Sequence, residues 1–125
     1  MKTSQSKKPK DGLVKEYFSD GKLSSVGKYE NGKKTGVWKY YLRNGLLKAT
    51  GKYSDDQFTG LWKWNRENGK TLQTGKFENG KQVGLWKRYH ASGELYDVGN
   101  YKDGKKTGEW KIHDSNGKLL RTKNY

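Results

Sequence analysis

Aromatic residues and glycines recur along this chain every 24 residues, separated by polar turn-forming pairs. A Gly-x-Trp-Lys motif begins units at residues 36, 60, 84 and 108, and a divergent copy begins at Gly12. A second glycine follows nine residues after each start, and a tyrosine or phenylalanine follows after seventeen. When the units are aligned, these residues occupy the same positions (columns) in each unit without any insertion. The chain is therefore a repeat protein. Its units are 12–35, 36–59, 60–83, 84–107 and a partial unit, 108–125.

Each unit is predicted to form a β-hairpin. Asn44-Gly45 and its counterparts lie between short aromatic and β-branched runs, which is the strongest sequence signal for a two-residue type I′ turn. Such a turn places Trp38 opposite Gly51 and Gly36 opposite Tyr53. We expect each tryptophan ring to cover the glycine directly opposite it, because the missing side chain exposes flat backbone there.

A second turn is predicted to connect each unit to the next. It falls at Asn31-Gly32, Asn79-Gly80 and Asp103-Gly104, whereas Asp55-Asp56 departs from the pattern. Short strands joined by turns in this order predict an all-β fold, an elongated single-layer antiparallel meander of repeated β-hairpins without a thick core. Its stability would come from contacts between neighbouring units.

The composition explains how such a sheet is stabilised. With 30% hydrophobic residues and a mean hydropathy of -1.26, a chain without the repeat would be expected to be disordered. Five tryptophans, nine tyrosines and three phenylalanines supply the missing packing, since each ring buries roughly 150–250 Å².

Residues 1–11 are predicted to be a flexible basic tail ahead of the repeat domain at 12–125. The tail lacks the apolar run of a signal peptide, and no stretch approaches the ~20 apolar residues of a membrane-spanning helix, so we expect a cytoplasmic protein. The chain has no cysteine, which excludes disulfides and thiolate chemistry.

Alternation along the strands predicts that a row of lysines lies on the face opposite the tryptophans. Every unit contributes one of them: Lys15, Lys39, Lys63, Lys87 and Lys111. Adjacent lysines are two strands apart, about 9.6 Å. Tyrosines are predicted beside them, at Tyr17, Tyr41 and Tyr89, with Lys28, Lys52 and Lys76 on the partner strands.

Two interpretations of the lysines are open. A net charge of +14 favours an anionic partner, whether an acidic protein, a nucleic acid or lipid head groups. Alternatively, the lysines keep an exposed sheet soluble and discourage pairing at its edges.

Departures from the repeat mark a second group of candidate binding residues. Phe58 replaces lysine or glutamine, Trp64 adds a second tryptophan after Trp62, and Tyr96 stands in a variable column. Exposed aromatics of this kind are typical interface anchors. The alternative is that they compensate locally for the irregular turn at Asp55-Asp56.

Catalytic, metal and cofactor sites are not predicted. His90 and His113 occupy columns held by apolar, aromatic or basic residues in other units, and the 17 glycines are spread by the repeat rather than gathered in a phosphate-binding loop. The sequence predicts a protein that is not an enzyme.

The consensus Gly-x-Trp-Lys-x-Tyr, x-Asn-Gly-x-Leu and Gly-x-Tyr-x-Asn-Gly-Lys, as in residues 36–53 and 75–81, resembles the MORN repeat in its bacterial variant form. The resemblance covers residues 12–125 and implies a β-hairpin solenoid without catalytic residues. It also implies phospholipid or protein binding, and many bacterial variant members are labelled as antitoxin or immunity components. Departures are Val14, Asp55-Asp56, Thr71-Leu72 and Lys123.

We therefore predict a non-catalytic scaffold that binds an acidic protein partner through its basic face and exposed aromatics, as an antitoxin or immunity protein would. The expected mechanism is occlusion by a rigid cationic sheet, with electrostatic steering of the encounter. Anionic phospholipid surfaces and sequence-independent nucleic-acid binding are the alternatives.

Overall fold

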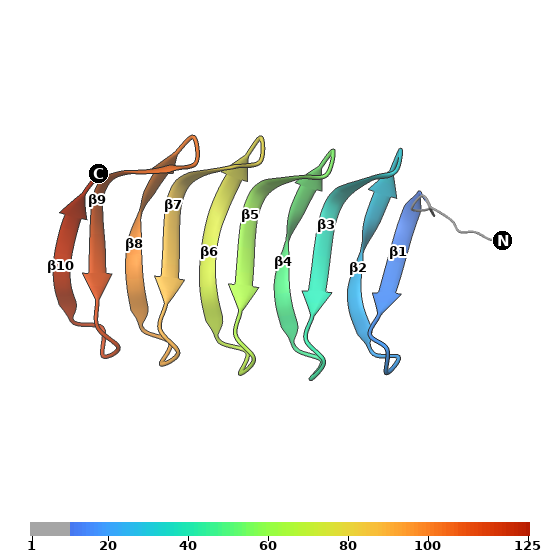
Figure 1. Cartoon of the computed structure of the whole chain (residues 1–125), viewed down its shortest axis with the longest axis horizontal. Coiled ribbons are helices and arrows are strands. Elements are labelled where there is room, and N and C mark those ends of the chain that lie inside the picture. Colours follow the sequence, from blue (N-terminus) through green and yellow to red (C-terminus); the bar gives the residue numbers. More distant parts are fainter. Residues whose placement is uncertain (1–10) are drawn as a thin grey trace.

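A computed structural model describes residues 11–125 and shows ten antiparallel strands in one open sheet. Each strand pairs with its neighbours in the chain, from β1 to β10, so the sheet is an uninterrupted meander (Figure 1). The strands are β1 (Gly12–Tyr17), β2 (Leu23–Glu30), β3 (Lys33–Tyr41), β4 (Leu47–Ser54), β5 (Gln57–Asn65), β6 (Thr71–Glu78), β7 (Lys81–Tyr89), β8 (Leu95–Lys102), β9 (Lys105–His113) and β10 (Leu119–Asn124).

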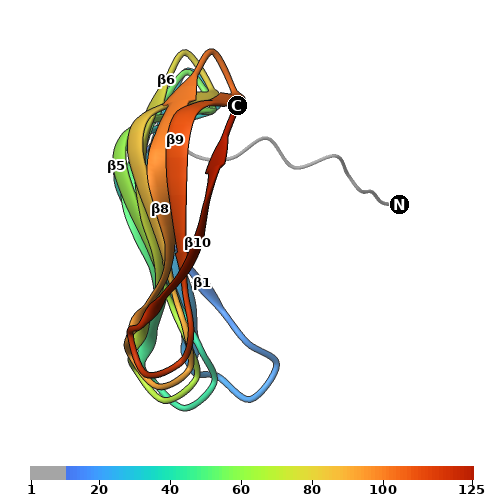
Figure 2. The same cartoon turned by 90° about the vertical axis from the view of Figure 1, so that its left-hand side faces the viewer.

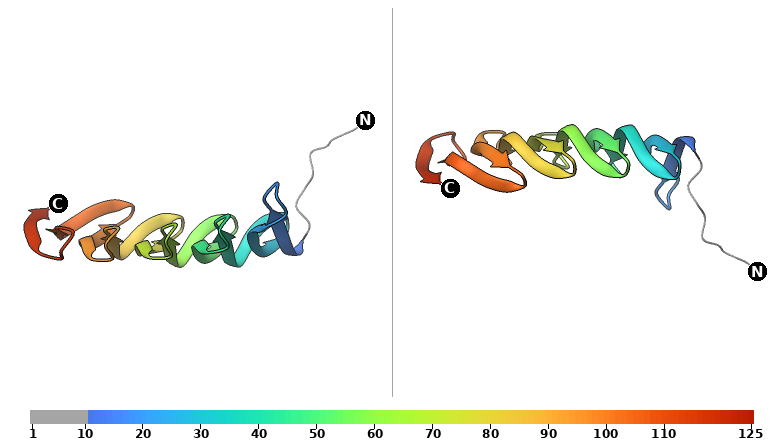
Figure 3. Two further views of the ribbon diagram at one scale, coloured as in Figure 1. Left: turned by 90° about the horizontal axis from the view of Figure 1, so that it is seen from below. Right: turned by 90° about the horizontal axis from the view of Figure 1, so that it is seen from above.

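The sheet is a single elongated layer. Viewed from its β10 end the sheet is thin and bent (Figure 2), and viewed from below and from above the hairpins follow one another as tilted copies (Figure 3). The all-β meander predicted from the sequence is confirmed. Except for Asp11, the predicted basic tail lies outside the described residues and stays a prediction.

The predicted strand register within the units is also confirmed. Trp38 lies opposite Gly51 and Gly36 opposite Tyr53, and the next two units repeat this with Trp62 opposite Gly75 and Trp86 opposite Gly99.

The turn within each unit differs from the prediction. In the second unit the Gly45 N–H donates to the Leu42 carbonyl (2.9 Å) and the Leu42 N–H donates to the Leu46 carbonyl (2.8 Å). Only Gly45 of the Asn44-Gly45 pair has a positive φ, 88°. These features describe a three-residue loop with glycine in the left-handed position, so the predicted two-residue type I′ turn is wrong.

A bulge explains why the register was nevertheless correct. Tyr40 pairs with Ala49 but Tyr41 pairs with Leu47, so Lys48 is an extra residue in β4. The longer loop shifts the pairing by one position and the bulge shifts it back.

Type I′ turns instead connect one unit to the next. Asn31 and Gly32 both have positive φ, 53° and 76°. Asp55 and Asp56 have the same conformation, 49° and 66°, so the irregular sequence preserves the turn. The Asp56 side chain adds a hydrogen bond from the Lys34 N–H (2.6 Å), which favours an aspartate where other units have glycine.

Each tryptophan covers a glycine of the preceding unit, rather than the glycine opposite it as we had expected. A methyl group built on Gly51 would overlap the ring of Trp62, which belongs to the following unit. The Trp62 Nε1–H also donates to the Lys52 carbonyl (2.9 Å). The glycine thus allows the ring to lie flat on the backbone of β4, and the indole is fixed by a hydrogen bond beside it.

These rings form one herringbone row along the sheet. Tyr53 meets Trp62 edge-on at 5.1 Å between ring centroids, and Phe77 meets Trp86 in the same way at 5.1 Å. Offset and edge-on contacts are the favoured geometries for aromatic pairs. The four Trp side chains of the motif are the most buried large residues described, so this aromatic face contains the core.

Hydrogen bonds between loops tie consecutive units together at the lower end of Figure 1. The Asn44 amide donates to the Glu67 carbonyl (3.0 Å), and the Ser92 hydroxyl donates to the Ser115 carbonyl (2.8 Å). The first loop leans away from the others in Figure 2. Within the described residues, its contact with the second loop is a stacking of Arg43 on the Phe18 ring (5.0 Å).

Candidate functional site

The face opposite the tryptophans carries the predicted row of lysines, and each lysine alternates with a β-branched residue. Lys39 pairs with Val26 on one side and Thr50 on the other, and Lys63 pairs with Thr50 and Thr74. Lys15, Lys87 and Lys111 continue the pattern. The five residues, termed the lysine row, therefore cross the whole sheet in one line.

The lysine row is not neutralised by ion pairs. Its members are exposed except Lys87, which is half-buried. Across residues 11–125 the structure contains one salt bridge, between Arg88 and Asp97 on the aromatic face. The lysine charges are thus available to an anionic partner.

An exposed apolar row runs parallel to the lysines and was missed at the sequence level. It comprises Leu13, Val37, Leu61 and Leu85, each two residues before a lysine of the row. Leu13 is 71% exposed and Leu61 74%. The signal was present in the x position of Gly-x-Trp-Lys, which is aliphatic in four units and Glu109 in the fifth.

Side chains of both rows line a shallow cavity at the middle of the sheet. It encloses about 470 Å³ and is lined by Val37, Leu61, Lys63 and the threonines at 50 and 74, among others. On the partner strands Lys52 pairs with Val37 and Lys76 pairs with Leu61. The aliphatic row, flanked by lysines on both sides, and the lysine row together are called the basic face below.

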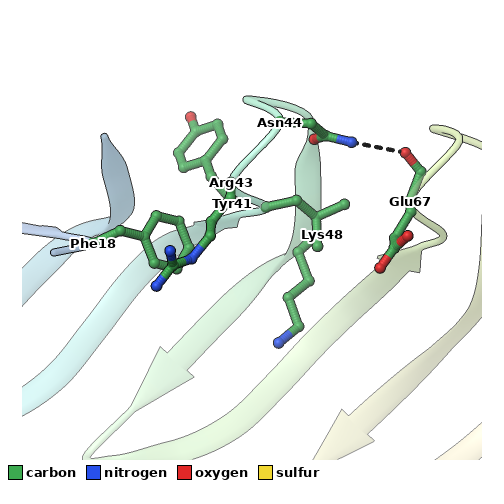
Figure 4. A pocket seen from close by; sticks show the side chains of 7 residues that line it. Phe18, Tyr41, Arg43, Asn44, Lys48 and Glu67 are labelled. Atoms are coloured by element: carbon green, nitrogen blue, oxygen red, sulfur yellow. Dashed lines mark hydrogen bonds between the residues drawn. The ribbon is translucent and has the colours of Figure 1, made fainter. Parts of the chain in front are cut away.

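The predicted tyrosines lie at the loop end of this face. Tyr17 is exposed, whereas Tyr41 and Tyr89 are half-buried. Tyr41 lines a cavity of about 410 Å³ with Phe18, Arg43, Lys48 and Glu67 (Figure 4). The tyrosines therefore border the basic face at its loop end.

The expectation that Phe58 and Trp64 are exposed anchors is wrong. Both are half-buried and pack against the core: Phe58 contacts Trp62 at 4.6 Å and Trp64 stacks on Trp62 at 5.7 Å. The alternative interpretation, local packing, fits them. Tyr96 is exposed as expected, but its ring lies against Arg88 (4.9 Å) and His90 (4.9 Å).

A lysine ammonium lies among three rings on the aromatic face. Lys34 Nζ is 4.9 Å from the Trp38 ring and 5.1 Å from the Tyr53 ring, and it donates to the Tyr40 hydroxyl (3.1 Å). The Tyr40 and Tyr53 hydroxyls are 2.8 Å apart. Burial is the main cause that raises the pKa of both tyrosines, because it disfavours the phenolate.

This pair predicts a loss of stability in alkaline solution. Below the ordinary phenol pKa of 10.0 the two tyrosine hydroxyls are protonated in both the folded and the unfolded protein. Above that pH the unfolded chain loses these protons first. The free energy of unfolding therefore falls as pH rises. Urea unfolding from about pH 9 to about pH 11 should show a shallower decline for Tyr53→Phe than for the parent. Tyr17→Phe, at an exposed site, should follow the parent, and identical slopes in all three would contradict the assignment.

The histidines do not form a catalytic or metal-binding cluster in the described chain. His90 Nε2 lies 2.8 Å from the backbone carbonyl of His113, so it links the loop after β7 to the end of β9. No group of three potential metal ligands occurs among residues 11–125. The same part of the chain contains no helix long and apolar enough to cross a membrane.

Comparison with family models finds the MORN repeat variant at residues 10–31, 58–81, 82–103 and 106–125. The chain belongs to the MORN repeat variant family. No curated protein matches it. Residues 32–57, between two matched segments, form the same MORN hairpin in β3 and β4, so the repeat is continuous in three dimensions.

Membership of the MORN family agrees with the geometry. The family is generally non-enzymatic and its repeats act as scaffolds, and the described residues form a scaffold with two dissimilar faces. The basic face presents exposed lysine and aliphatic side chains, whereas the core rings occupy much of the other face.

Proposed function

We propose that this MORN protein binds an acidic protein partner through its basic face. The observation that supports the proposal is the parallel course of the lysine row and the exposed aliphatic row on one side of the sheet. Protein interfaces combine an apolar centre with charged surroundings in this way. The lysines attract the partner over distance, and the aliphatic side chains are dehydrated once it docks.

Binding would act by occlusion. A sheet of ten strands is wide, so a partner lying flat on the basic face would have much of its own surface covered. If that surface contains an active site, the partner is inhibited, which is how an antitoxin or immunity protein works. The support for this finer step is the resemblance described above.

A nucleic-acid ligand fits the basic face less well. Single-stranded nucleic acids are bound by basic grooves with aromatic platforms for the bases. Here aliphatic side chains lie between the basic rows, and the tyrosines stand only at the loop end.

An anionic membrane surface is the second candidate. Leu13 and Leu61 are largely exposed, and apolar side chains flanked by lysines suit the boundary between head groups and acyl chains. Co-sedimentation with vesicles of phosphatidylserine and phosphatidylcholine tests this candidate, with pure phosphatidylcholine vesicles as the control.

The test of the proposal uses charge reversal on one face. Lys39→Glu, Lys63→Glu and Lys87→Glu, combined, should abolish capture of an acidic protein from lysate of the source organism. The reason is that the reversed row repels the partner and leaves the sheet intact. Lys22→Glu, Lys70→Glu and Lys118→Glu make the same change in net charge at the loops and should retain capture.

Circular dichroism must show the same β-type spectrum for both triple variants. Equal capture by the two variants would refute a role of the lysine row. Capture of nucleic acid alone, lost steeply as salt rises, would favour the rival ligand. Sedimentation only with phosphatidylserine vesicles would favour the membrane.

A further inference from the structure

A polar hollow lies on the aromatic face, in the fourth unit. In the third unit Trp64 fills the space beside Trp62, stacking on it at 5.7 Å and reaching Trp86 at 6.0 Å. The equivalent residue one unit later is Arg88. A cavity of about 140 Å³ opens there between Trp86 and Trp110, and its polar lining consists of Gln73, Gln82, Arg88, Asp97 and Lys106.

Arg88 is held in one orientation by its neighbours. Its Nε and Nη2 donate to the two carboxylate oxygens of Asp97 at 3.0 Å and 2.6 Å. The Tyr96 ring lies against the guanidinium at 4.9 Å. Asp97 is 3% exposed, while the Arg88 side chain is 46% exposed. Nη1 makes no hydrogen bond to another described residue, so a fixed donor remains for a ligand.

A second cation lines the same cavity. The Lys106 ammonium lies over the Trp110 ring at 4.6 Å and over the Tyr125 ring at 5.2 Å. It forms no salt bridge with a described carboxylate. The cavity therefore contains two cations and one carboxylate that is already paired, and the amides of Gln73 and Gln82 add further donors.

The fold itself does not require this ion pair. At the equivalent positions the second unit has Tyr40 opposite Ala49 and the third has Trp64 opposite Gln73. A buried ion pair is often no more stable than the apolar pair it replaces. The charged residues in the fourth unit thus point to a ligand rather than to packing.

We infer that this cavity binds the carboxylate of a small molecule with a flat apolar portion. The carboxylate would accept hydrogen bonds from Arg88 and lie near Lys106, while the apolar portion would contact the half-buried ring of Tyr101, which also lines the cavity. The site is on the face opposite the basic face, so it does not depend on the function proposed there.

Sodium benzoate is a suitable probe, and benzamide is its neutral counterpart of similar shape. Two-dimensional NMR at constant ionic strength should show saturable shifts of the Gln73 and Gln82 side-chain amides and of the Trp110 indole N–H with benzoate. Benzamide should bind at least about tenfold more weakly, because it lacks the charge that Arg88 and Lys106 recognise.

The decisive variant fills the cavity with the residues of the preceding unit. Arg88→Trp with Asp97→Gln reproduces the pair Trp64 and Gln73 and should fold normally but show no benzoate shifts. Lys106→Met should weaken binding several-fold. The control Lys34→Met removes the equivalent cation three units earlier and should leave the benzoate affinity unchanged.

Three results would overturn the inference. Equal binding of benzamide would show a merely apolar hollow. Benzoate shifts retained in the filled variant would place the ligand elsewhere. Shifts spread over the lysine row in place of the cavity would show unspecific association of an anion with a basic protein.

Discussion

Replacing Gly75 with alanine is expected to lower the free energy of unfolding by about 3–5 kcal/mol, as large as deleting a buried aromatic side chain. A methyl group on Gly75 would overlap the Trp86 ring. Trp86 is buried, and its Nε1–H donates to the Lys76 carbonyl (3.1 Å). The indole must therefore leave both its packing site and its hydrogen bond. Urea unfolding followed by circular dichroism measures the loss.

A double-mutant cycle separates this clash from an intrinsic effect of alanine in the strand. In a Trp86→Ala background the added methyl group meets no ring, so Gly75→Ala should cost less than about 1 kcal/mol. An equal cost in both backgrounds would mean that the tryptophan is not the obstacle.

Arg88→Met should destabilise the protein by about 2–4 kcal/mol, because it leaves the carboxylate of Asp97 buried without its partner. The value is set below that for a fully buried pair, since water reaches the half-exposed Arg88 site. Thermal or urea unfolding at neutral pH gives the comparison.

Removing the other partner should cost less. After Asp97→Ala the guanidinium of Arg88 remains in contact with water, so about 1 kcal/mol is expected. Arg88→Trp with Asp97→Gln should recover most of the stability lost in Arg88→Met. A larger loss from Asp97→Ala than from Arg88→Met would contradict the burial of the carboxylate as the cause.

The repeat allowed the strands and their pairing to be predicted, but not the turns. Asn-Gly pairs occur in both kinds of turn, and both kinds place glycine at positive φ. The sequence therefore does not distinguish the two-residue turn at Asn31-Gly32 from the three-residue loop at Asn44-Gly45. The bulge at Lys48 hid the difference, because it restores the register further along the strand.

The lysine row could be predicted because side chains alternate between the two faces along a strand. The packing of side chains between units could not be predicted in this way. Phe58 departs from lysine and glutamine in its column, which suggested a surface role. Lys34 in that column lies over aromatic rings, so a phenylalanine there simply joins them. The ion pair of Arg88 and Asp97 could have been predicted from the sequence. The register that places Trp86 opposite Gly99 also places Arg88 opposite Asp97.

Each tryptophan lies on a glycine of the preceding unit. This arrangement determines how such proteins can gain or lose repeats. Deleting residues 60–83 would bring Trp86 over Gly51, which has the same surroundings as Gly75. Duplicating them would likewise leave each glycine equivalent to Gly51 covered by a tryptophan. Recombination in steps of 24 residues thus preserves the joints between units, and a gene of this kind can lengthen or shorten its binding surface without redesigning its core.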